Sequence, residues 1–348
     1  MSDKMKIAVF RDVRKIELEE ADIPLPKGKQ ILVRLKACAI CTWEQRVYTG
    51  VKKVEFPFIG GHEMVGEIVE LGEGVDNKIW KKGDRVAIGV MLACGQCYYC
   101  QIGEHGCCEN FNHSKHLDGL PYRGMGGLSQ YMLVCQEDIF RIENVSDEEA
   151  TITEPLSCVI NSVETGDPRF GQNVLVIGCG IMGLLHVILA AKKGATVIAC
   201  DVNEQRLELA KSMGARYTIN PAKEDLSTTV KSLTHHRGAD IVFDTTPIAD
   251  LVKEAFKSVS MMGKIVLYSS FYPDVPIEFS PDWVHKKSIQ ILGTANSSRN
   301  DFIKAAKMIS DGTVDMKPFV SEVYNFSEIT EALESAAKAD KFRVVVKL

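Results

Sequence analysis

Four cysteines in one short stretch form the most specific chemical pattern in this sequence. They follow the spacing Cys94-x2-Cys97-x2-Cys100-x7-Cys108. Four thiolates can enclose a zinc ion tetrahedrally, and such a site is closed because no coordination position remains for a substrate. The segment 94–108 contains few apolar residues, so metal binding would supply much of the free energy that folds it. We therefore predict a structural zinc lobe here.

Two alternatives for this lobe stay open. Cys107 stands beside Cys108, and the spacing favours Cys108 as the fourth ligand. The eleven cysteines of the chain could also form a redox-active or disulfide-bonded cluster. A long chain without an export signal more commonly uses clustered cysteines for metal. His105 is interpreted as a polar loop residue.

A glycine-rich turn predicts a dinucleotide site of the GxGxxG type. It follows an apolar strand-like run and opens a helical pattern, which is the required context. The first glycine permits a tight turn, the second lets the backbone approach a pyrophosphate, and the third allows close helix–strand packing. The helix N-terminus offers free N–H groups to the phosphates. The residues of the turn are Gly178, Cys179, Gly180, Ile181, Met182 and Gly183.

An acidic residue follows this turn at the distance that a nucleotide site needs, about 20 positions. Asp201 directly follows the predicted strand Thr196–Cys200 and could bind both ribose hydroxyls. A carboxylate at this place repels a 2′-phosphate, so we expect NAD rather than NADP. Arg206 lies about one helical turn further on, where it either reaches the adenosine ribose or is a surface arginine. The alternative is a glycine turn that binds no nucleotide.

Four more residues of the metal-binding type are dispersed along the chain. Cys41 lies just after a strand-like run, His62 and Glu63 follow a pair of glycines, and Glu154 precedes a proline. Individually these are weak signals, because a single cysteine is usually a small core residue. Their spacing alone does not bring them together.

In combination, the motifs resemble the zinc-containing medium-chain dehydrogenase/reductase superfamily, in particular its polyol- and threonine-dehydrogenase-like branch. The resemblance covers essentially the whole chain and keeps the family's motif order. The matching segments are 37–44 (ACAICTWE), 61–66 (GHEMVG), 82–86 (KGDRV), the four-cysteine lobe, 154–158 (EPLSC) and the GxGxxG turn.

The resemblance implies a catalytic zinc ion held by Cys41, His62 and Glu154, with Glu63 binding directly or through water. Together with the lobe, this makes two zinc ions per chain, one catalytic and one structural. The alcohol-dehydrogenase branch usually has cysteine where Glu154 stands. Glutamate is a harder oxygen ligand, and it favours a polyol-dehydrogenase-like enzyme.

One position departs from the family pattern. The family usually has Ser or Thr two residues after the first ligand, where the hydroxyl passes the alcohol proton towards solvent, and this chain has Trp43. Indole has a donor N–H but no basic site, so it cannot relay a proton. Either Trp43 forms an aromatic wall over the substrate, with Glu63, Glu154, water or a substrate hydroxyl carrying the proton, or it packs into the core. Glu44 replaces the family's Asp one position later.

The elements that must position these residues fall into two classes. The first ~150 residues contain runs rich in β-branched residues, such as Gln30–Ala37 and Met64–Leu71, separated by Gly, Pro and Asp turns. After this point strands alternate with helices, which predicts a doubly wound parallel sheet. The expected strands are Asn173–Ile177, Thr196–Cys200, Asp240–Asp244 and Lys264–Tyr268, with helices at Leu184–Lys193 and Glu204–Met213.

We therefore predict an α/β protein with two domains. The resemblance implies a GroES-like, β-rich catalytic domain formed by residues 1–150 and 291–348, which includes the structural-zinc lobe 94–108. A Rossmann NAD-binding domain, residues 151–290, is inserted between them. Asn296 and Arg299, near the return to the first domain, are candidates for contact with substrate or nicotinamide, with a surface loop as the alternative.

The expected function is zinc-dependent hydride transfer between NAD and a secondary alcohol or ketone of a small polar substrate, such as a polyol, a sugar derivative or an amino alcohol. One alternative is a zinc-free NAD(P)H-dependent quinone or enone reductase on the same fold. Another is a non-catalytic, zinc-stabilised NAD-binding protein. The set Cys41, His62 and Glu154 argues against both.

The composition of the chain limits which classes of binding partner we expect. The 348-residue chain has a formal net charge of −5, so it lacks the basic footprint of a nucleic-acid-binding protein. No apolar run approaches the ~20 residues that span a bilayer. We expect no membrane partner and a cytoplasmic location, and the resemblance implies a homodimer or homotetramer.

Overall fold

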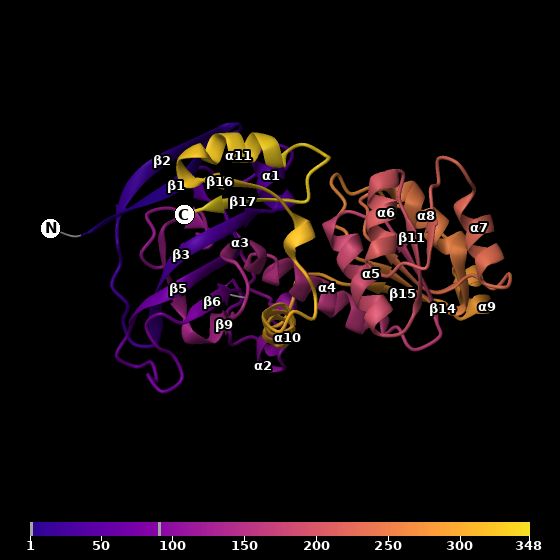
Figure 1. Ribbon diagram of the computed structural model, residues 1–348, viewed down its shortest axis with the longest axis horizontal. Helices are drawn as coiled ribbons and strands as arrows, with labels where there is room; N and C mark the ends of the chain where they lie inside the picture. The colour runs from indigo at the N-terminus through magenta and orange to yellow at the C-terminus, as the bar shows by residue number, and fades with distance from the viewer. Residues whose placement is uncertain (1–2, 90–91) are drawn as a thin grey trace. The chain divides into compact units, whose positions relative to one another are not determined.

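The computed structural model describes residues 3–89 and 92–348 and divides them into two compact units. One unit contains the chain up to Ser157 together with Ser297–Leu348, and the other contains Cys158–Asn296. The two units are the indigo-to-magenta and yellow part and the pink-to-orange part of Figure 1. We had placed the boundaries at 150 and 290, a few residues earlier than the division in the structure.

The first unit is built on two β-sheets, as the β-rich pattern predicted. The longest strands, β3 (Gln30–Ile40) and β5 (Glu63–Leu71), pair antiparallel at the centre of the larger sheet. The order of this sheet is β16-β17-β3-β5-β6-β9, with β8 also paired to β3, and the order of the smaller sheet is β2-β1-β4-β7. The remaining bounds are β1 Lys4–Asp12, β2 Lys15–Asp22, β4 Phe58–Ile59, β6 Arg85–Ile88, β7 Arg123–Gly124, β8 Tyr131–Cys135, β9 Ile139–Arg141, β16 Val320–Asn325 and β17 Arg343–Lys347.

These strands bury alternating apolar side chains in one core. Ile31, Val33 and Leu35 of β3 belong to it, and so do Ile68 of β5 and Val344 of β17. Helix α11 (Ile329–Ala336) packs on β16 and β17, as the strands and helix labelled in Figure 1 show. The other helices of this unit are α1 Thr42–Tyr48, α2 Tyr98–Gln101, α3 Asp147–Ala150 and α10 Arg299–Ser310. Helix α4 (Thr153–Gly166) begins in this unit.

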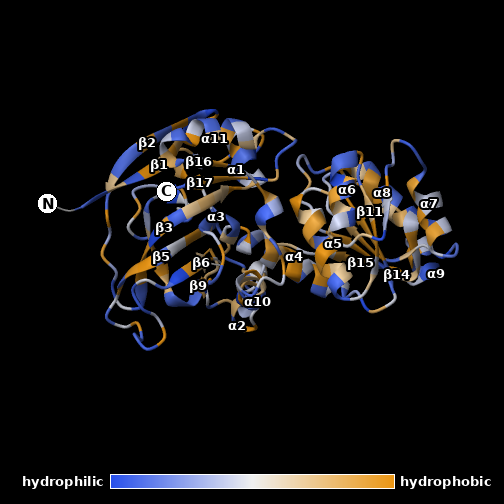
Figure 2. Ribbon diagram, viewed as in Figure 1, coloured by the Kyte–Doolittle hydropathy of each residue, from blue (hydrophilic) through white to orange (hydrophobic). Residues whose placement is uncertain are grey.

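The second unit is a parallel sheet with helices, as predicted. Its strand order is β12-β11-β10-β13-β14-β15, and each neighbouring pair is parallel. Strand β10 is almost fully buried, which explains its continuous apolar run, because helices cover both faces of such a sheet. In Figure 2 the hydrophobic colour concentrates on these central strands, while hydrophilic residues line the outer helices and loops.

Each predicted strand and helix of this unit is present, with bounds that differ by at most five residues, whereas β12, β15, α7, α8 and α9 were not predicted. The strands are β10 Asn173–Ile177, β11 Thr196–Cys200, β12 Tyr217–Ile219, β13 Ala239–Asp244, β14 Val259–Leu267 and β15 Gln290–Gly293. The helices are α5 Ile181–Lys192, α6 Glu204–Ser212, α7 Leu226–Leu233, α8 Ala249–Ser258 and α9 Pro281–Lys287. Within residues 3–89 and 92–348, no helix has the length and hydrophobicity that crossing a bilayer requires.

Candidate metal centres and dinucleotide site

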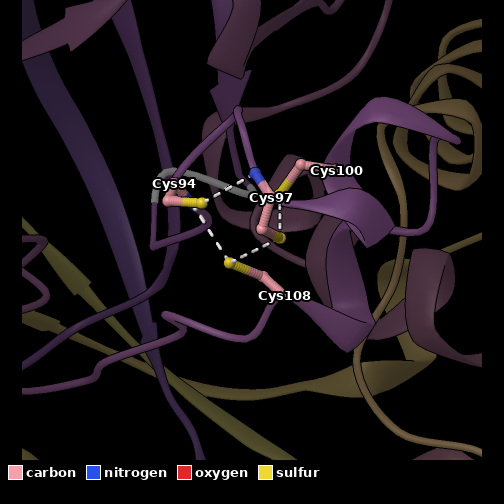
Figure 3. A group of neighbouring side chains, drawn as sticks. All are labelled: Cys94, Cys97, Cys100 and Cys108. Atoms are coloured by element: carbon pink, nitrogen blue, oxygen red, sulfur yellow. Dashed lines mark hydrogen bonds between the residues drawn. The ribbon is translucent and has the colours of Figure 1, made fainter.

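The four cysteines of the lobe meet in space. The sulfur atoms of Cys94, Cys97, Cys100 and Cys108 all lie within 4.8 Å of one another, and Figure 3 shows the four side chains converging. The Sγ atom of Cys97 is 3.5 Å from that of Cys100 and 3.9 Å from that of Cys108. Cys107 is exposed and outside this group, and all eleven cysteines are free thiols. The geometry therefore brings together the set that the spacing favoured.

The local electrostatics of the lobe suit a cation. Hydrogen bonds from the backbone N–H of Gln96 and from the Asn110 side chain lower the pKa of Cys94 to about 6. Backbone N–H groups likewise lower the pKa of Cys97, whereas burial raises the pKa of Cys100 to about 12. N–H donors that face sulfur stabilise thiolate, which is the form that binds metal. The residues present therefore fit a tetrahedral zinc ion.

An arginine fastens this lobe to the rest of its unit. Arg299 Nη2 donates to Asp138 Oδ1 at 2.9 Å, and Arg299 Nη1 lies 3.2 Å from His105 Nε2. His105 Nδ1 in turn lies 2.8 Å from the carbonyl oxygen of Gly103 in the lobe. Arg299 is thus committed to a structural network rather than exposed in a loop, and His105 is buried. Asn296, the other candidate, belongs to the second unit.

A second group of possible metal ligands lies where β3 and β5 pair. One ligand atom each of Cys41, His62 and Glu63 lies within 4.8 Å of the others. Cys41 directly follows β3, and Glu63 opens β5 opposite Ala39. The antiparallel register therefore brings together residues that are distant in the sequence.

Glu44 orients His62. Its Oε1 atom lies 2.9 Å from His62 Nδ1 and accepts a hydrogen bond from the backbone N–H of Gly61 at 3.0 Å. With Nδ1 engaged, the other ring nitrogen of His62 is the one available to a metal, as is usual for ligating histidines. Burial opposes the charged form of His62, but Glu44 and Cys41 outweigh it and raise its pKa. Glu44 thus fixes the ring orientation of His62.

A buried arginine that the sequence did not reveal completes this cluster. Arg343, the first residue of β17, donates from Nε to Glu63 Oε2 and from Nη2 to Glu63 Oε1, both at 2.7 Å. The Arg343 side chain is only 5% exposed and Glu63 is fully buried. Arg343 Nη2 also lies 3.7 Å from Cys41 Sγ. Each oxygen of Glu63 accepts one hydrogen bond from Arg343 and keeps a second lone pair, so this ion pair is compatible with direct metal binding by Glu63.

The glycine-rich turn has the close packing that the fingerprint requires. Gly178 has a φ of 91°, and a β-carbon on Gly183 would lie 1.8 Å from the carbonyl oxygen of Gly178. Gly180 is the N-cap of α5, and a β-carbon there would meet no atom within 4 Å. The turn is therefore tightly packed at Gly178 and Gly183. Gly180, in contrast, leaves the space that a phosphate group needs.

Asp201 closes this turn from the neighbouring strand. Its Oδ2 atom accepts a hydrogen bond from the backbone N–H of Cys179 at 2.7 Å, and Oδ1 accepts one from the N–H of Asn203 at 2.8 Å. The side chain of Asn203 caps α6 and binds the backbone N–H of Arg206 at 3.1 Å. Asp201 and Arg206 thus stand at the carboxyl end of β11 and in the first turn of the following helix.

Two family models match this chain. The model described as alcohol dehydrogenase GroES-like domain covers residues 27–144, and the model described as zinc-binding dehydrogenase covers residues 182–311. The sorbitol dehydrogenase of Bacillus subtilis (strain 168) is 31% identical over 341 residues, which are 95% of this chain and 93% of that protein. The chain belongs to the zinc-type alcohol dehydrogenase family.

Other members of this family are similar to this chain along its full length. The L-threonine 3-dehydrogenase of Pyrococcus furiosus is 29% identical to this zinc-type dehydrogenase and each chain is covered completely. A solved structure from Sinorhizobium meliloti 1021 with bound NADP has a TM-score of 0.89 at 25% identity, covering 99% of this chain and 100% of that one. The α/β fold predicted from the sequence, with its GroES-like and Rossmann parts, is confirmed.

One expected ligand of this zinc-type dehydrogenase lies outside the second group. Glu154 stands in the first turn of α4, and Cys41, His62 and Glu154 do not form a set whose ligand atoms all lie within 4.8 Å of one another. The negative charge of Glu154 nevertheless acts on Arg343, whose pKa is raised because Glu63 and other anions outweigh its burial. Glu63 therefore contacts Arg343 directly, whereas Glu154 acts on it through its charge.

The Trp43 side chain packs against neighbouring side chains. Its ring stacks on His113 with 5.3 Å between centroids and an interplanar angle of 19°, and it lies 5.4 Å from the ring of Phe58. It also packs against the hydrophobic core. The Nζ atom of Lys52 lies 5.1 Å from the ring centroid. Within the described residues, the buried Nε1 atom of Trp43 has no hydrogen-bond partner.

Proposed function

We propose that this chain is a zinc-dependent, NAD-linked dehydrogenase that interconverts a secondary hydroxyl and a ketone on a small polar substrate. The observation that carries the proposal is the cluster of Cys41, His62 and Glu63, in which Glu44 already orients the histidine. A protein in which zinc only stabilises the lobe would not need this second group of metal ligands. The sorbitol and threonine dehydrogenases among the relatives support a polyol, sugar derivative or amino alcohol as substrate.

The roles follow from the contacts of each residue. Cys41 and His62 would hold the catalytic ion, with Glu154 as the oxygen ligand. Zinc, when bound, makes an alcohol oxygen more acidic, and NAD accepts the hydride. Arg343 fixes the Glu63 carboxylate with two hydrogen bonds, so Glu63 would lie beside the ion and bind it directly or through water. Trp43 shields one side of this cluster, and no hydroxyl at its position can pass a proton.

The cofactor preference is assigned to Asp201. Both of its carboxylate oxygens accept backbone N–H groups, so the side chain is fixed at the end of β11. A 2′-phosphate would bring further negative charge to this carboxylate, which favours NAD. Because the similar solved structure from Sinorhizobium meliloti 1021 contains NADP, activity with NAD and activity with NADP should be compared directly.

One set of measurements tests the proposal. Elemental analysis should find two zinc ions per chain, and NADH should form when the zinc-loaded protein receives NAD and a panel of polyols and amino alcohols. Removal of the more labile zinc should abolish this activity while the protein stays folded. One zinc per chain without activity would reduce the protein to a zinc-stabilised binding module. Reduction of an enone or quinone without zinc would support the alternative reductase.

A further inference from the structure

Two hydrogen-bond donors beside the proposed catalytic cluster have no acceptor within residues 3–89 and 92–348. They are the Lys52 ammonium group and the His113 imidazole, which both contact the ring of Trp43, two positions after Cys41. The charges of His62 and Lys52 both act on His113, and the charges of Glu44 and Cys41 act on Lys52. Both side chains therefore lie near the metal-binding group.

Lys52 lacks a counter-ion. The ion pairs of the described residues include none at this lysine, whose ammonium group instead faces the Trp43 ring at 5.1 Å. Glu44, whose charge acts on Lys52, engages His62 and Gly61 through Oε1, and within the described residues its buried Oε2 atom has no hydrogen-bond partner, Lys52 included. Burial and the charge of Arg46 lower the pKa of Lys52. A half-buried cation without a partner is unfavourable, and an incoming anion would relieve that cost.

His113 adds a neutral donor next to this charge. Burial, together with the charges of His62 and Lys52, lowers the pKa of His113 to about 4, so the imidazole is neutral near pH 7 and carries one N–H. Within residues 3–89 and 92–348 its ring makes stacking contacts with Trp43 and Phe111 but no hydrogen bond. The Nε1 atom of Trp43 is buried, so Trp43 contributes its ring and no donor. Carboxylate and phosphate groups accept N–H donors in any of several orientations.

We propose that the substrate of this dehydrogenase carries an anionic group, a carboxylate or a phosphate ester, which Lys52 binds together with the N–H group of His113. This inference rests on the proposed function, because it gives a substrate class to the same site. A neutral polyol would leave the Lys52 charge uncompensated, so we expect it to be a poor substrate.

Matched substrates test the inference. The panel contains sorbitol as the neutral member, a sorbitol phosphate ester and a sugar acid of the same chain length, each supplied with NAD and the zinc-loaded enzyme. We expect KM for at least one anionic member to be about tenfold or more below that of sorbitol. The phosphate and acid arms show which anion the site prefers. Equal kcat/KM values for all three would overturn the proposal.

A pair of adjacent lysines supplies the control. Lys52→Gln should raise KM for the anionic substrate by about tenfold or more and should raise KM for sorbitol much less. Lys53→Gln removes the same charge from an exposed neighbour and should change neither. If Lys52→Gln lowers turnover of neutral and anionic substrates equally, Lys52 supports the fold and does not bind an anion.

A binding measurement separates this inference from the proposed function. Calorimetric titration of the phosphate ester and the sugar acid into the zinc-loaded protein needs no turnover. Binding that Lys52→Gln weakens and Lys53→Gln does not would support the anion site even if no alcohol in the panel is oxidised. Turnover of neutral polyols without measurable binding of either anion would leave the dehydrogenase intact and refute the anion site.

Discussion

At the scale of single residues, the buried pair of Glu63 and Arg343 is the most consequential feature. Two parallel hydrogen bonds join them, and both side chains are out of contact with water. Removing both charges from water is costly, so such a pair persists only when its geometry satisfies both partners. The pair therefore defines the shape of the catalytic cluster, because Glu63 and Cys41 both face the same guanidinium.

Arg343→Met should lower the free energy of unfolding by about 3–5 kcal/mol, because it leaves the Glu63 carboxylate buried without a partner. Chemical denaturation of the metal-free protein measures this. The double variant Glu63→Gln/Arg343→Met should recover much of the loss, since neither charge then remains. Lys347→Met on the same strand removes a surface pair with Glu148 and should cost at most about 1 kcal/mol. A loss at Arg343 no larger than this control would mean that the pair is not a structural constraint.

At the scale of secondary-structure elements, the lobe differs from the sheets in what holds it together. Helix α2 has a single buried residue, Cys100, whereas β3 and β5 bury most of their side chains. The lobe therefore depends on its sulfur ligands and on the Arg299 network. The sheets depend on apolar burial and on backbone pairing.

The adjacent cysteines allow a sharp test of the lobe. Cys108→Ser should release one zinc ion per chain, because it removes a member of the converging group. Cys107→Ser should retain it, because that side chain is exposed and outside the group. Zinc content by elemental analysis, together with limited proteolysis of residues 94–108, measures both effects. Loss of zinc from the Cys107 variant alone would show that the ligand assignment is wrong.

Structure that depends on neighbouring residues could be predicted from the sequence, whereas contacts between residues far apart in the sequence could not. The strands of the parallel sheet were read from continuous apolar runs, and the lobe from cysteine spacing, because a few neighbouring residues determine each. Arg343 was missed because only the pairing of β17 with β3 brings it to Glu63. Helix α10 was missed although the sequence shows its signal, since Ser298 and Asp301 form a capping box.

The contacts within the proposed catalytic cluster could not be predicted for a similar reason. The contact between Cys41 and the GHE segment follows from the register of β3 and β5, and only the resemblance suggested it in advance. Glu154 lies on a helix outside those strands, and the structure does not complete the expected ligand set with it. The stacking of His113 on Trp43 joins a loop to a helix, and no periodicity encodes such a contact.

At the scale of the whole molecule, the second unit presents an open sheet edge. Strand β15 lies at one end of the sheet order, and Ile291 on it is 37% exposed. Val275 and Phe279, which precede it, are 51% and 50% exposed, and α9 buries none of its residues. An exposed apolar edge of this kind favours pairing with another strand. We take this as support for a homo-oligomer.

Light scattering coupled to gel filtration should therefore find a dimer or tetramer. Ile291→Lys should shift the population towards monomer, because lysine on an edge strand opposes pairing. Ile303→Lys on α10 provides the control, since Ile303 is 57% exposed and lies on the other unit. A monomeric wild-type protein, or an equal response of both variants, would contradict this use of the edge.

The interlock between Gly178 and Gly183 restricts how this protein can be redesigned. Even alanine at Gly183 would press its methyl carbon into the carbonyl oxygen of Gly178, so saturation mutagenesis there would return almost only inactive clones. A library intended to change the accepted coenzyme should leave the glycines intact and vary Asp201 and Arg206 instead. With the proposed roles of Asp201 and Arg206, we expect adaptation to another nicotinamide pool to proceed through side chains at the end of β11 and the start of α6.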